Sequence, residues 1–349
     1  MPKTNKHIEI IVTSLGDGLN SMSLKSRTMI KKVLQKHYSR VGISVVNNAA
    51  DLAAVAAKNP DLAFIGVKKI PVNGINSPSE DFLWVAEYLE QNGITTTGSG
   101  SDAIRLEQDK TQAKDIVMAA GLATSPYFVA KKGQYSDEAQ LPLKFPMFIK
   151  PPDMGAGAGI DDDSVVRNFK EYESKINSLC SDNRSKALVE EYLFGREFTV
   201  ALMLDTERKN IMVMPIQQLP LANGRGDAVI GQAMKESATE TAVSIVEESV
   251  LKQSVMKLAK DVFIALGARD YGRIDMRLDE NNVPNFLEAN LIPGLIDGSG
   301  NFQKACQMNL GMKYEDMIQH IVALAFAREL SSELVIPETG TTVLEYQAA

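Results

Sequence analysis

The sequence predicts a protein of mixed α/β and α+β architecture that is built from several lobes. Its 349 residues exceed what one ordinary hydrophobic core organises. The first hundred residues alternate strand and helix patterns, which is typical of a small parallel sheet covered by helices. The remainder changes to strands separated by polar turns, with a few long helices, and this texture is typical of α+β domains.

The amino-terminal lobe is expected to contain three strand and helix units. Short apolar runs predict strands at residues 8–12, 43–46 and 62–65. Helical spacing of apolar residues predicts helices at residues 21–38, 49–58 and 82–89. Asn59-Pro60 and Asn92-Gly93 follow the last two helices and should end them. The order of these elements implies a parallel sheet.

The rest of the chain divides into further helices and strands. Helices are expected at residues 102–120, 169–179, 251–266, 301–308 and 314–329. Strands are expected at residues 127–130, 147–149, 188–192, 198–204, 211–216, 272–278 and 283–289. We predict an amino-terminal lobe of residues 1–98, two further subdomains of residues 99–194 and 195–335, and a loose tail of residues 336–349.

Composition excludes several classes of function. The net charge is −7, and no long basic block offers a surface for nucleic acid. No apolar run approaches the roughly 20 residues that span a bilayer. The two cysteines, Cys180 and Cys306, lie far apart, so a zinc site or disulfide framework is not expected. A cytoplasmic protein without nucleic-acid or membrane partners is therefore expected.

The strongest chemical signal is a predicted hairpin near residue 280. Alternation places Arg273 and Asp275 on one face of its first strand, and Glu288 and Asn290 share a face of the second. If the strands pair across their turn, two carboxylates and an amide oxygen converge. Such oxygen ligands suit Mg²⁺ that also carries phosphate. Arg273 would lie beside the metal and stabilise a transferring phosphoryl group. The alternative is an exposed hairpin with solvated charges.

Two weaker signals lie upstream. Lys150 ends a strand, and the loop after it has glycines at Gly155, Gly157 and Gly159. Their backbone N–H groups could approach phosphates, although the spacing matches neither a Walker A loop nor a Rossmann opening. A flexible surface turn is the alternative. At residues 187–200, a strand that ends in a polar turn could bind adenine and ribose, or it could be a strand end with solvated acids.

In this order, and with Thr97-Gly98-Ser99-Gly100 followed by Asp109-Lys110, these motifs resemble the ATP-grasp superfamily, specifically its D-alanine-D-alanine ligase branch. The resemblance covers roughly residues 94–328. It implies a three-lobed ATP-grasp fold with a small parallel α/β lobe at the amino terminus. It also implies an ATP-dependent ligase that activates a carboxylate as an acyl phosphate and joins it to an amine, with amino-acid-like substrates.

The resemblance also implies roles for individual residues. ATP would be bound by Lys110, Lys150, Gly155, Gly157, Glu190, Glu191, Leu193, Glu197 and, by a looser alignment, Lys235. Within that set, Glu190 and Glu197 would hold adenine and ribose. Two Mg²⁺ ions, with Mn²⁺ as a substitute, would be bound by Asp275, Glu288 and Asn290. Arg273 would stabilise the acyl phosphate and the tetrahedral intermediate, and Ser299 would contact a substrate carboxylate. A homodimer is compatible with the resemblance.

Departures from the family concern the substrate pocket. D-alanine-D-alanine ligases carry Gly-Ser-Ser-Val-Gly in the glycine loop, whereas residues 155–159 have no hydroxyl. The family's first-lobe glutamate falls near Leu19 or Asn20, and its central tyrosine falls near Glu236. We therefore predict that D-alanyl-D-alanine is not made efficiently, because each lost polar contact costs about 1–3 kcal/mol.

Three alternatives stand beside this prediction. A D-alanine-D-alanine ligase with a reworked pocket would replace the missing contacts from the polar loop of residues 219–238. A non-catalytic ATP-binding regulatory module is disfavoured, because it would need neither Arg273 nor the metal ligands. A Rossmann oxidoreductase is excluded by the lack of Gly-x-Gly-x-x-Gly after the first strand.

Overall fold

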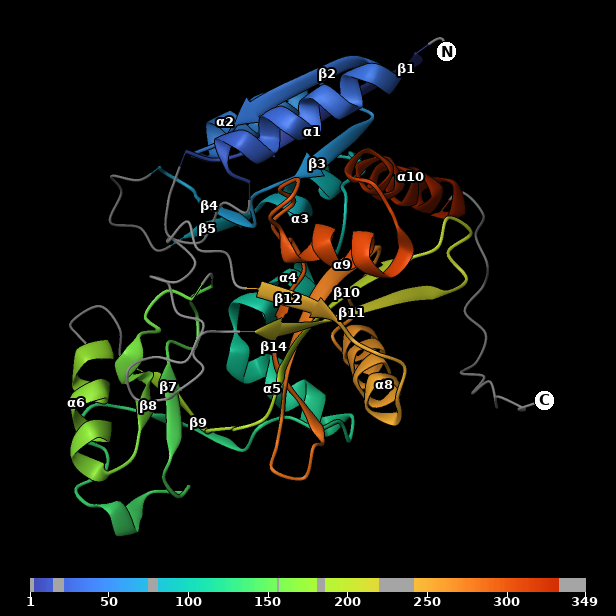
Figure 1. The fold of residues 1–349 in the computed structure, drawn as a ribbon. Coiled ribbons are helices and arrows are strands. Elements are labelled where there is room, and N and C mark those ends of the chain that lie inside the picture. Colours follow the sequence, from blue (N-terminus) through green and yellow to red (C-terminus); the bar gives the residue numbers. More distant parts are fainter. Residues whose placement is uncertain are drawn as a thin grey trace.

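The computed structural model describes residues 3–14, 22–74, 81–155, 157–180, 186–219 and 242–332, and side chains as far as residue 328. Three groups of elements follow one another along the chain (Figure 1). No helix in these ranges is long and apolar enough to cross a membrane. The predictions for Leu19, Asn20, Lys235, Glu236 and the tail of residues 336–349 concern residues outside the described ranges.

The amino-terminal lobe contains the predicted parallel sheet. Its strands are β1 (Thr4–Val12), β2 (Tyr38–Val45) and β3 (Leu62–Ile65), in the order β2-β1-β3. The helices α1 (Leu24–His37), α2 (Ala49–Ala57) and α3 (Val85–Gln91) pack against it, as Figure 1 shows at the blue end of the chain. Ser23 and Asn48 cap the first two helices by accepting backbone N–H groups, as helix starts favour.

Two helix predictions in this region are wrong. Residues 82–89 do not form one helix, because Phe82–Trp84 is strand β5, which pairs with β4 (Lys69–Pro71). The Lys69 ammonium lies 4.3 Å from the Phe82 ring centre, so the aromatic side chains stabilise a hairpin here. Residues 102–120 form two helices, α4 (Ser101–Gln108) and α5 (Lys110–Ala119). Asp109 separates them and caps α5 through its side chain.

The middle of the chain forms a second, antiparallel sheet with strand order β6-β9-β7-β8. Its strands are β6 (Tyr127–Ala130), β7 (Met147–Lys150), β8 (Val165–Val166) and β9 (Ala187–Glu191). Helix α6 (Phe169–Leu179) covers the sheet through Tyr172 and Ile176. Two short 3₁₀ helices, η1 (Glu138–Gln140) and η2 (Asp162–Ser164), lie in the connections. The glycine-rich loop follows β7 directly, so Lys150 marks the point where the sheet ends.

The third group is a five-stranded antiparallel sheet with strand order β12-β11-β10-β13-β14. Its strands are β10 (Glu197–Leu204), β11 (Ile211–Leu219), β12 (Ala242–Ile245), β13 (Tyr271–Leu278) and β14 (Pro284–Asn290). Helix α8 (Val250–Ala265) covers one face. Helices α9 (Asn301–Leu310) and α10 (Tyr314–Ser332) lie on the other side (Figure 1). The predicted hairpin is therefore present as β13 and β14.

The α9 face of this sheet is apolar at one end and polar at the other. Along β10, Ala201 and Met203 pack in the core shared with α9. Glu197 and Thr199 point to the same face by alternation but lie beyond that core. The apolar core on this face therefore ends between Ala201 and Thr199, and polar side chains continue the same face of the strand.

Candidate active site

The strands β13 and β14 bring the predicted metal ligands together. Asp275 lies directly opposite Glu288, and Arg273 lies opposite Asn290. Nδ2 of Asn290 donates to Oδ2 of Asp275 at 3.0 Å. A register shift after Asp275 gives Leu287 no partner, which keeps Glu288 and Asn290 on the face of Asp275.

Arg273 binds Asp275 through two parallel hydrogen bonds. Its Nε lies 3.0 Å from Oδ1, and its Nη2 lies 2.8 Å from Oδ2. Burial opposes the guanidinium charge, but Asp275 and Glu288 more than offset it and raise the pKa of Arg273. The guanidinium therefore stays charged beside the two carboxylates.

Sequence reasoning missed Thr199, which lies opposite Asp275 on β10. Its hydroxyl donates to Oδ1 of Asp275 at 2.8 Å, and Gln218 donates to that hydroxyl at 2.6 Å. The chain Gln218–Thr199–Asp275 fixes the orientation of the carboxylate from three neighbouring strands. Thr199 and Asp275 are 76 residues apart in the sequence. The only sequence signal for Thr199 is strand alternation, which places its side chain on the same face as Glu197.

Lys110 joins the glycine-rich loop to this face. Its backbone N–H donates to the carbonyl of Pro152 at 3.0 Å, and its ammonium donates to the carbonyl of Met154. The ammonium also lies 3.6 Å from Oε2 of Glu288. Burial lowers the pKa of Lys110, and Glu288 acts in the opposite direction. The predicted phosphate lysine and a predicted metal ligand are thus neighbours.

Lys150 belongs to a buried cluster that the sequence did not reveal. Oε2 of Glu190 lies 2.7 Å from the Lys150 ammonium, and Oε1 lies 2.6 Å from the ammonium of Lys114. The hydroxyl of Ser125 also donates to Glu190, at 3.3 Å. Both oxygens of Glu190, for which adenine or ribose contact was predicted, are therefore engaged by cations.

The electrostatics of this cluster are strongly coupled. Burial disfavours the Glu190 carboxylate, yet Lys114 and Lys150 lower its pKa to about 2. Burial lowers the pKa of Lys114 to about 8, against the attraction of Glu190. Two ammonium groups and one carboxylate leave one net positive charge. The signal for Lys114 was its position one helical turn after Lys110.

The remaining predicted nucleotide residues surround the connection between β9 and β10. Glu191 is exposed at the end of β9, and Leu193 is buried in the connection. Glu197 begins β10 and lies opposite Arg277, with Oε2 3.8 Å from Nη1. These three residues therefore follow one another along a single edge of the site.

The glycine-rich loop faces the amino-terminal lobe. Gly157 has φ +78°, a conformation that other residues rarely adopt. A Cβ on Gly155 would lie 3.9 Å from the ammonium of Lys68. Lys68 is buried and lies 2.5 Å from Oε1 of Glu107, whose other oxygen accepts the N–H of Leu291. This pair, which sequence analysis missed, connects the first lobe to the end of β14.

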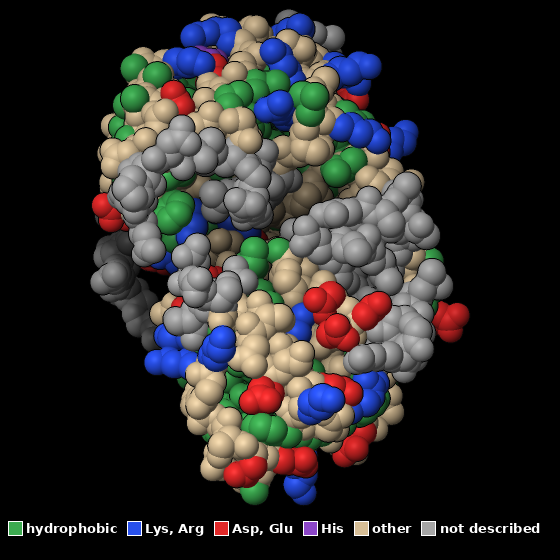
Figure 2. All heavy atoms as spheres, turned by 90° about the vertical axis from the view of Figure 1, so that its left-hand side faces the viewer, with side chains coloured by type: hydrophobic (Ala, Val, Ile, Leu, Met, Phe, Trp, Pro, Cys, Tyr) green, Lys and Arg blue, Asp and Glu red, His purple; other side chains and the backbone are tan. Residues whose placement is uncertain are grey.

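Basic side chains also appear within a hollow at mid-height of the molecule in Figure 2. The view is turned so that the left-hand side of Figure 1 faces the reader. That side carries the green sheet with the glycine-rich loop. A hollow with basic side chains suits a ligand that carries phosphate.

Ser299 lies in the connection between β14 and α9. Its N–H donates to the carbonyl of Ile296 at 3.3 Å. No hydrogen bond joins its side chain to Arg273 in the part of the chain that the structure describes. The carbonyl of Leu295, earlier in the same segment, accepts hydrogen bonds from Ser26 of α1 and Tyr314 of α10, at 2.5 and 3.2 Å. The first lobe and α10 thus hold this segment together.

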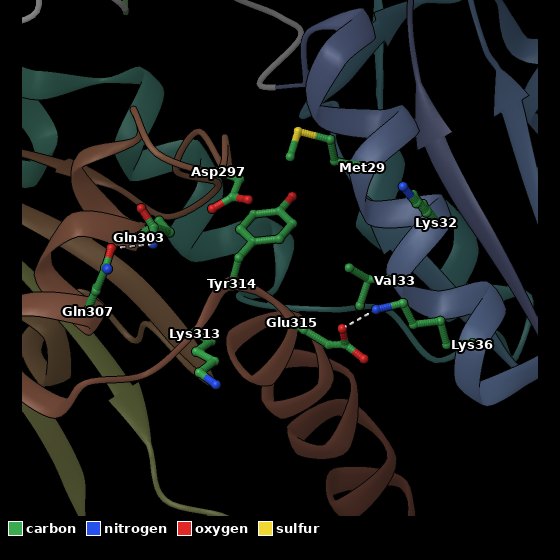
Figure 3. Close-up of a pocket in the computed structure, with 10 residues that line it drawn as sticks. All are labelled: Met29, Lys32, Val33, Lys36, Asp297, Gln303, Gln307, Lys313, Tyr314 and Glu315. Atoms are coloured by element: carbon green, nitrogen blue, oxygen red, sulfur yellow. Dashed lines mark hydrogen bonds and ion pairs between the residues drawn. The ribbon is translucent and has the colours of Figure 1, made fainter. Parts of the chain in front are cut away.

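Beside that segment lies a pocket of about 480 Å³ (Figure 3). Met29 and Lys32 of α1 form one wall, Gln303 of α9 forms another, and Tyr314 lies between them. Lys36 and Glu315 form an ion pair that joins α1 to α10 at one end. The pocket therefore separates the first lobe from α9, on the side of the segment that faces α1.

The oxygen atoms on β13 and β14 fit a divalent cation that carries phosphate. No group of three or more His, Cys, Asp or Glu side chains within the described ranges could hold a metal alone. Mg²⁺ commonly takes one or two carboxylates and completes its shell with phosphate and water oxygens. Asp275 and Glu288 supply two carboxylates. Because Asn290 donates through Nδ2, its Oδ1 is the amide atom that can bind a cation.

Comparison with known proteins assigns the family. The model described as "D-ala D-ala ligase C-terminus" matches residues 116–323. The D-alanine–D-alanine ligase of Geotalea uraniireducens is 28% identical over 306 residues, covering 87% of this chain and 91% of that protein. The enzyme of Desulforudis audaxviator with the same name is 29% identical over 311 residues, covering 88% and 94%.

The fold agrees with these matches. A crystal structure of D-alanine–D-alanine ligase from Bacillus anthracis complexed with ATP superposes with a TM-score of 0.68 and 21% identity, covering 94% of this chain and 99% of that chain. The chain belongs to the D-Ala-D-Ala ligase family, and the predicted ATP-grasp fold is confirmed. It is an ADP-forming ligase that makes carbon–nitrogen bonds with ATP and a divalent metal. The regulatory-module alternative is thereby disfavoured.

Proposed function

We propose that this ligase joins the carboxylate of one amino-acid-like substrate to the amine of another, and that D-alanine is not its preferred first substrate. The observation that carries the proposal is the polar strip on β10, β13 and β14, where Asp275, Glu288, Asn290 and Arg273 meet. This strip contains the groups that phosphoryl transfer requires, whereas the glycine-rich loop lacks the hydroxyl groups of the D-alanine enzymes.

In the proposed reaction, a carboxylate oxygen of the first substrate attacks the γ-phosphorus of ATP, and the bond to ADP breaks. The amine of the second substrate then attacks the acyl carbon, the amine loses a proton, and phosphate leaves. Lys110 would hold phosphate oxygens beside the loop, and Arg273 would stabilise the negative charge that develops on the acyl phosphate. Lys150 and Lys114, both paired with Glu190, would leave one net positive charge beneath the phosphates of ATP.

Asp275, Glu288 and Asn290 would hold two Mg²⁺ ions, for which Mn²⁺ could substitute. When bound, the ions would neutralise phosphate charge and align the transferring group. Glu197 would accept hydrogen bonds from the ribose hydroxyls, while Glu191 and Leu193 would offer backbone groups to adenine. Lys235 is proposed as a further phosphate contact. The enzyme would act in the cytoplasm.

The first lobe supports the choice of substrate. This lobe presents Lys68, paired with Glu107, to the loop near Gly155. A site built around a small zwitterion loses affinity when its polar partners are exchanged. Ser299 would remain as a contact for a substrate carboxylate.

The second candidate is a D-alanine–D-alanine ligase, which the names of the related proteins favour. Incubation with ATP, Mg²⁺ and a matrix of amino-acid pairs, with ADP release and mass spectrometry as readouts, separates the two. We expect an amide product from a pair other than two D-alanines. Dipeptide formation from D-alanine at about 10⁴ M⁻¹s⁻¹ or faster would favour the second candidate instead.

A further inference from the structure

Arg277 holds the connection between β9 and β10 at several points. Its Nε donates to the carbonyl of Gly195 at 3.1 Å, and its Nη2 donates to the hydroxyl of Tyr192 at 3.3 Å. The guanidinium carbon also lies 5.0 Å from the centre of the Tyr192 ring. Nη1 lies 3.8 Å from Oε2 of Glu197. The planar guanidinium group of Arg277 therefore contacts both ends and the middle of the connection.

The backbone of the connection lies tightly against β13 at the same place. The N–H of Gly195 donates to the carbonyl of Leu278 at 3.1 Å, and the N–H of Leu278 donates to the carbonyl of Arg196 at 3.0 Å. A Cβ on Gly195 would lie 2.5 Å from the Leu278 carbonyl oxygen, so no side chain fits there. These contacts fix the backbone of the connection against the end of β13, and the side chain of Arg277 packs against the connection.

Register places Arg277 directly opposite the proposed ribose carboxylate and two residues from a proposed metal ligand. It lies opposite Glu197 on β10, while Asp275, two residues earlier on the same face, lies opposite Thr199. An arginine carries five donors in a planar fork, which suits it to hold a carbonyl, a hydroxyl and a carboxylate simultaneously. The position of Glu197 relative to Asp275 therefore depends on this fork.

We propose that Arg277 is a positioning residue for the ribose of ATP, and that it gives the enzyme its preference for ATP over 2′-deoxyATP. The proposal rests on the assignment of Glu197 to the ribose hydroxyls. A carboxylate that accepts hydrogen bonds from both hydroxyls must lie at a fixed distance and angle from the sugar. Arg277 supplies that restraint because it attaches Glu197 and the connection before it to the metal-bearing strand.

The test compares the dissociation constants of ATP and 2′-deoxyATP by calorimetric titration with Mg²⁺, on the full chain without carboxylate substrate. We expect the wild type to bind ATP about tenfold more tightly, the usual size of one hydrogen bond to a charged group. Arg277→Met and Glu197→Gln should each bring the ratio of the two constants close to one. Arg196→Met is the matched control, because Arg196 is exposed and its side chain contacts Gln217. It should keep the wild-type ratio.

Circular dichroism establishes that the variants are folded. If Arg277→Met does not fold, Arg277→Lys takes its place, since lysine retains the charge and the aliphatic stem but not the fork. A folded Arg277 variant that binds ATP with the wild-type ratio would overturn the proposal. Wild-type binding of both nucleotides with equal affinity would also overturn it, and the ligase assignment would stand. Absence of ATP binding in the wild type would instead contradict the proposed function as a whole.

Discussion

Replacing Lys114 with methionine tests the buried cluster under the proposed nucleotide site. The substitution removes an ammonium that lies 2.6 Å from Glu190 and donates to the hydroxyls of Thr124 and Ser125 at 2.7 and 2.9 Å. Methionine has nearly the same length, so the change is mainly one of charge. Glu190 would retain Lys150 and Ser125 as partners.

The magnitude follows from the two pKa values. Lowering the pKa of Glu190 from 4.5 to about 2 corresponds to roughly 3 kcal/mol in favour of the ionised carboxylate. Lowering the pKa of Lys114 from 10.5 to about 8 corresponds to roughly 3 kcal/mol against the ammonium. Each shift is of the same size as the roughly 3–5 kcal/mol that loss of one partner from a buried ion pair costs. Because Lys150 remains, we expect the lower end of that range.

Thermal melts and ATP titrations measure the outcome. We expect Lys114→Met to melt roughly 4 °C lower and to bind ATP about tenfold more weakly, because Glu190 then neutralises Lys150 completely. The double variant Lys114→Met/Glu190→Gln should recover most of the stability, since no buried carboxylate remains short of a partner. Lys132→Met, at an exposed position after β6, is the control. A Lys114→Met protein with wild-type melting temperature and ATP affinity would refute this reasoning.

Three further predictions concern the same site. Glu288→Gln should reduce turnover by at least about a hundredfold while circular dichroism stays unchanged, because a metal ligand loses its charge; wild-type turnover would contradict the assignment. Lys150→Ala should reduce the rise in melting temperature that ATP and Mg²⁺ produce, and equal rises in both proteins would count against its role. ATP affinity should fall as pH rises through about 8, because Lys114 loses its proton there and the cluster changes from one net positive charge to none; affinity that rises over this range would be inconsistent with the cluster.

The sequence sufficed to predict that the proposed metal ligands meet on one sheet face, because these residues are close in sequence. Asp275, Glu288 and Asn290 lie on two strands joined by a short turn, so alternation and one hairpin register determine which side chains meet. The same argument fails for Thr199 and Arg277. Their partners come from the pairing of β10 with β13, which are separated by more than sixty residues, and nothing in either strand specifies that pairing.

Helix boundaries and buried charges were harder to predict for a different reason. The apolar pattern of residues 102–120 is not interrupted at Asp109, and only its non-helical backbone and its side-chain cap show that α5 begins there. Lys114 looked like an ordinary polar position on that helix. Its burial arises because β6 and β9 bring Ser125 and Glu190 against α5, a tertiary contact that helical periodicity does not contain.

The position of the site on the large sheet follows from the length of helix α9. Six of the eight residues of strand β10 are apolar, and Phe198, Val200 and Leu202 among them face α8. On its other face, α9 covers Ala201 and Met203 but does not extend over Thr199 and Glu197. The two strand residues that α9 leaves uncovered are polar, and each lies opposite a charged residue of β13. An apolar residue at Thr199 would leave Asp275 without its hydroxyl donor and would extend the core toward the metal ligands. On this face of β10, the apolar core therefore ends at Ala201, and the proposed site begins at Thr199, two residues earlier in the chain.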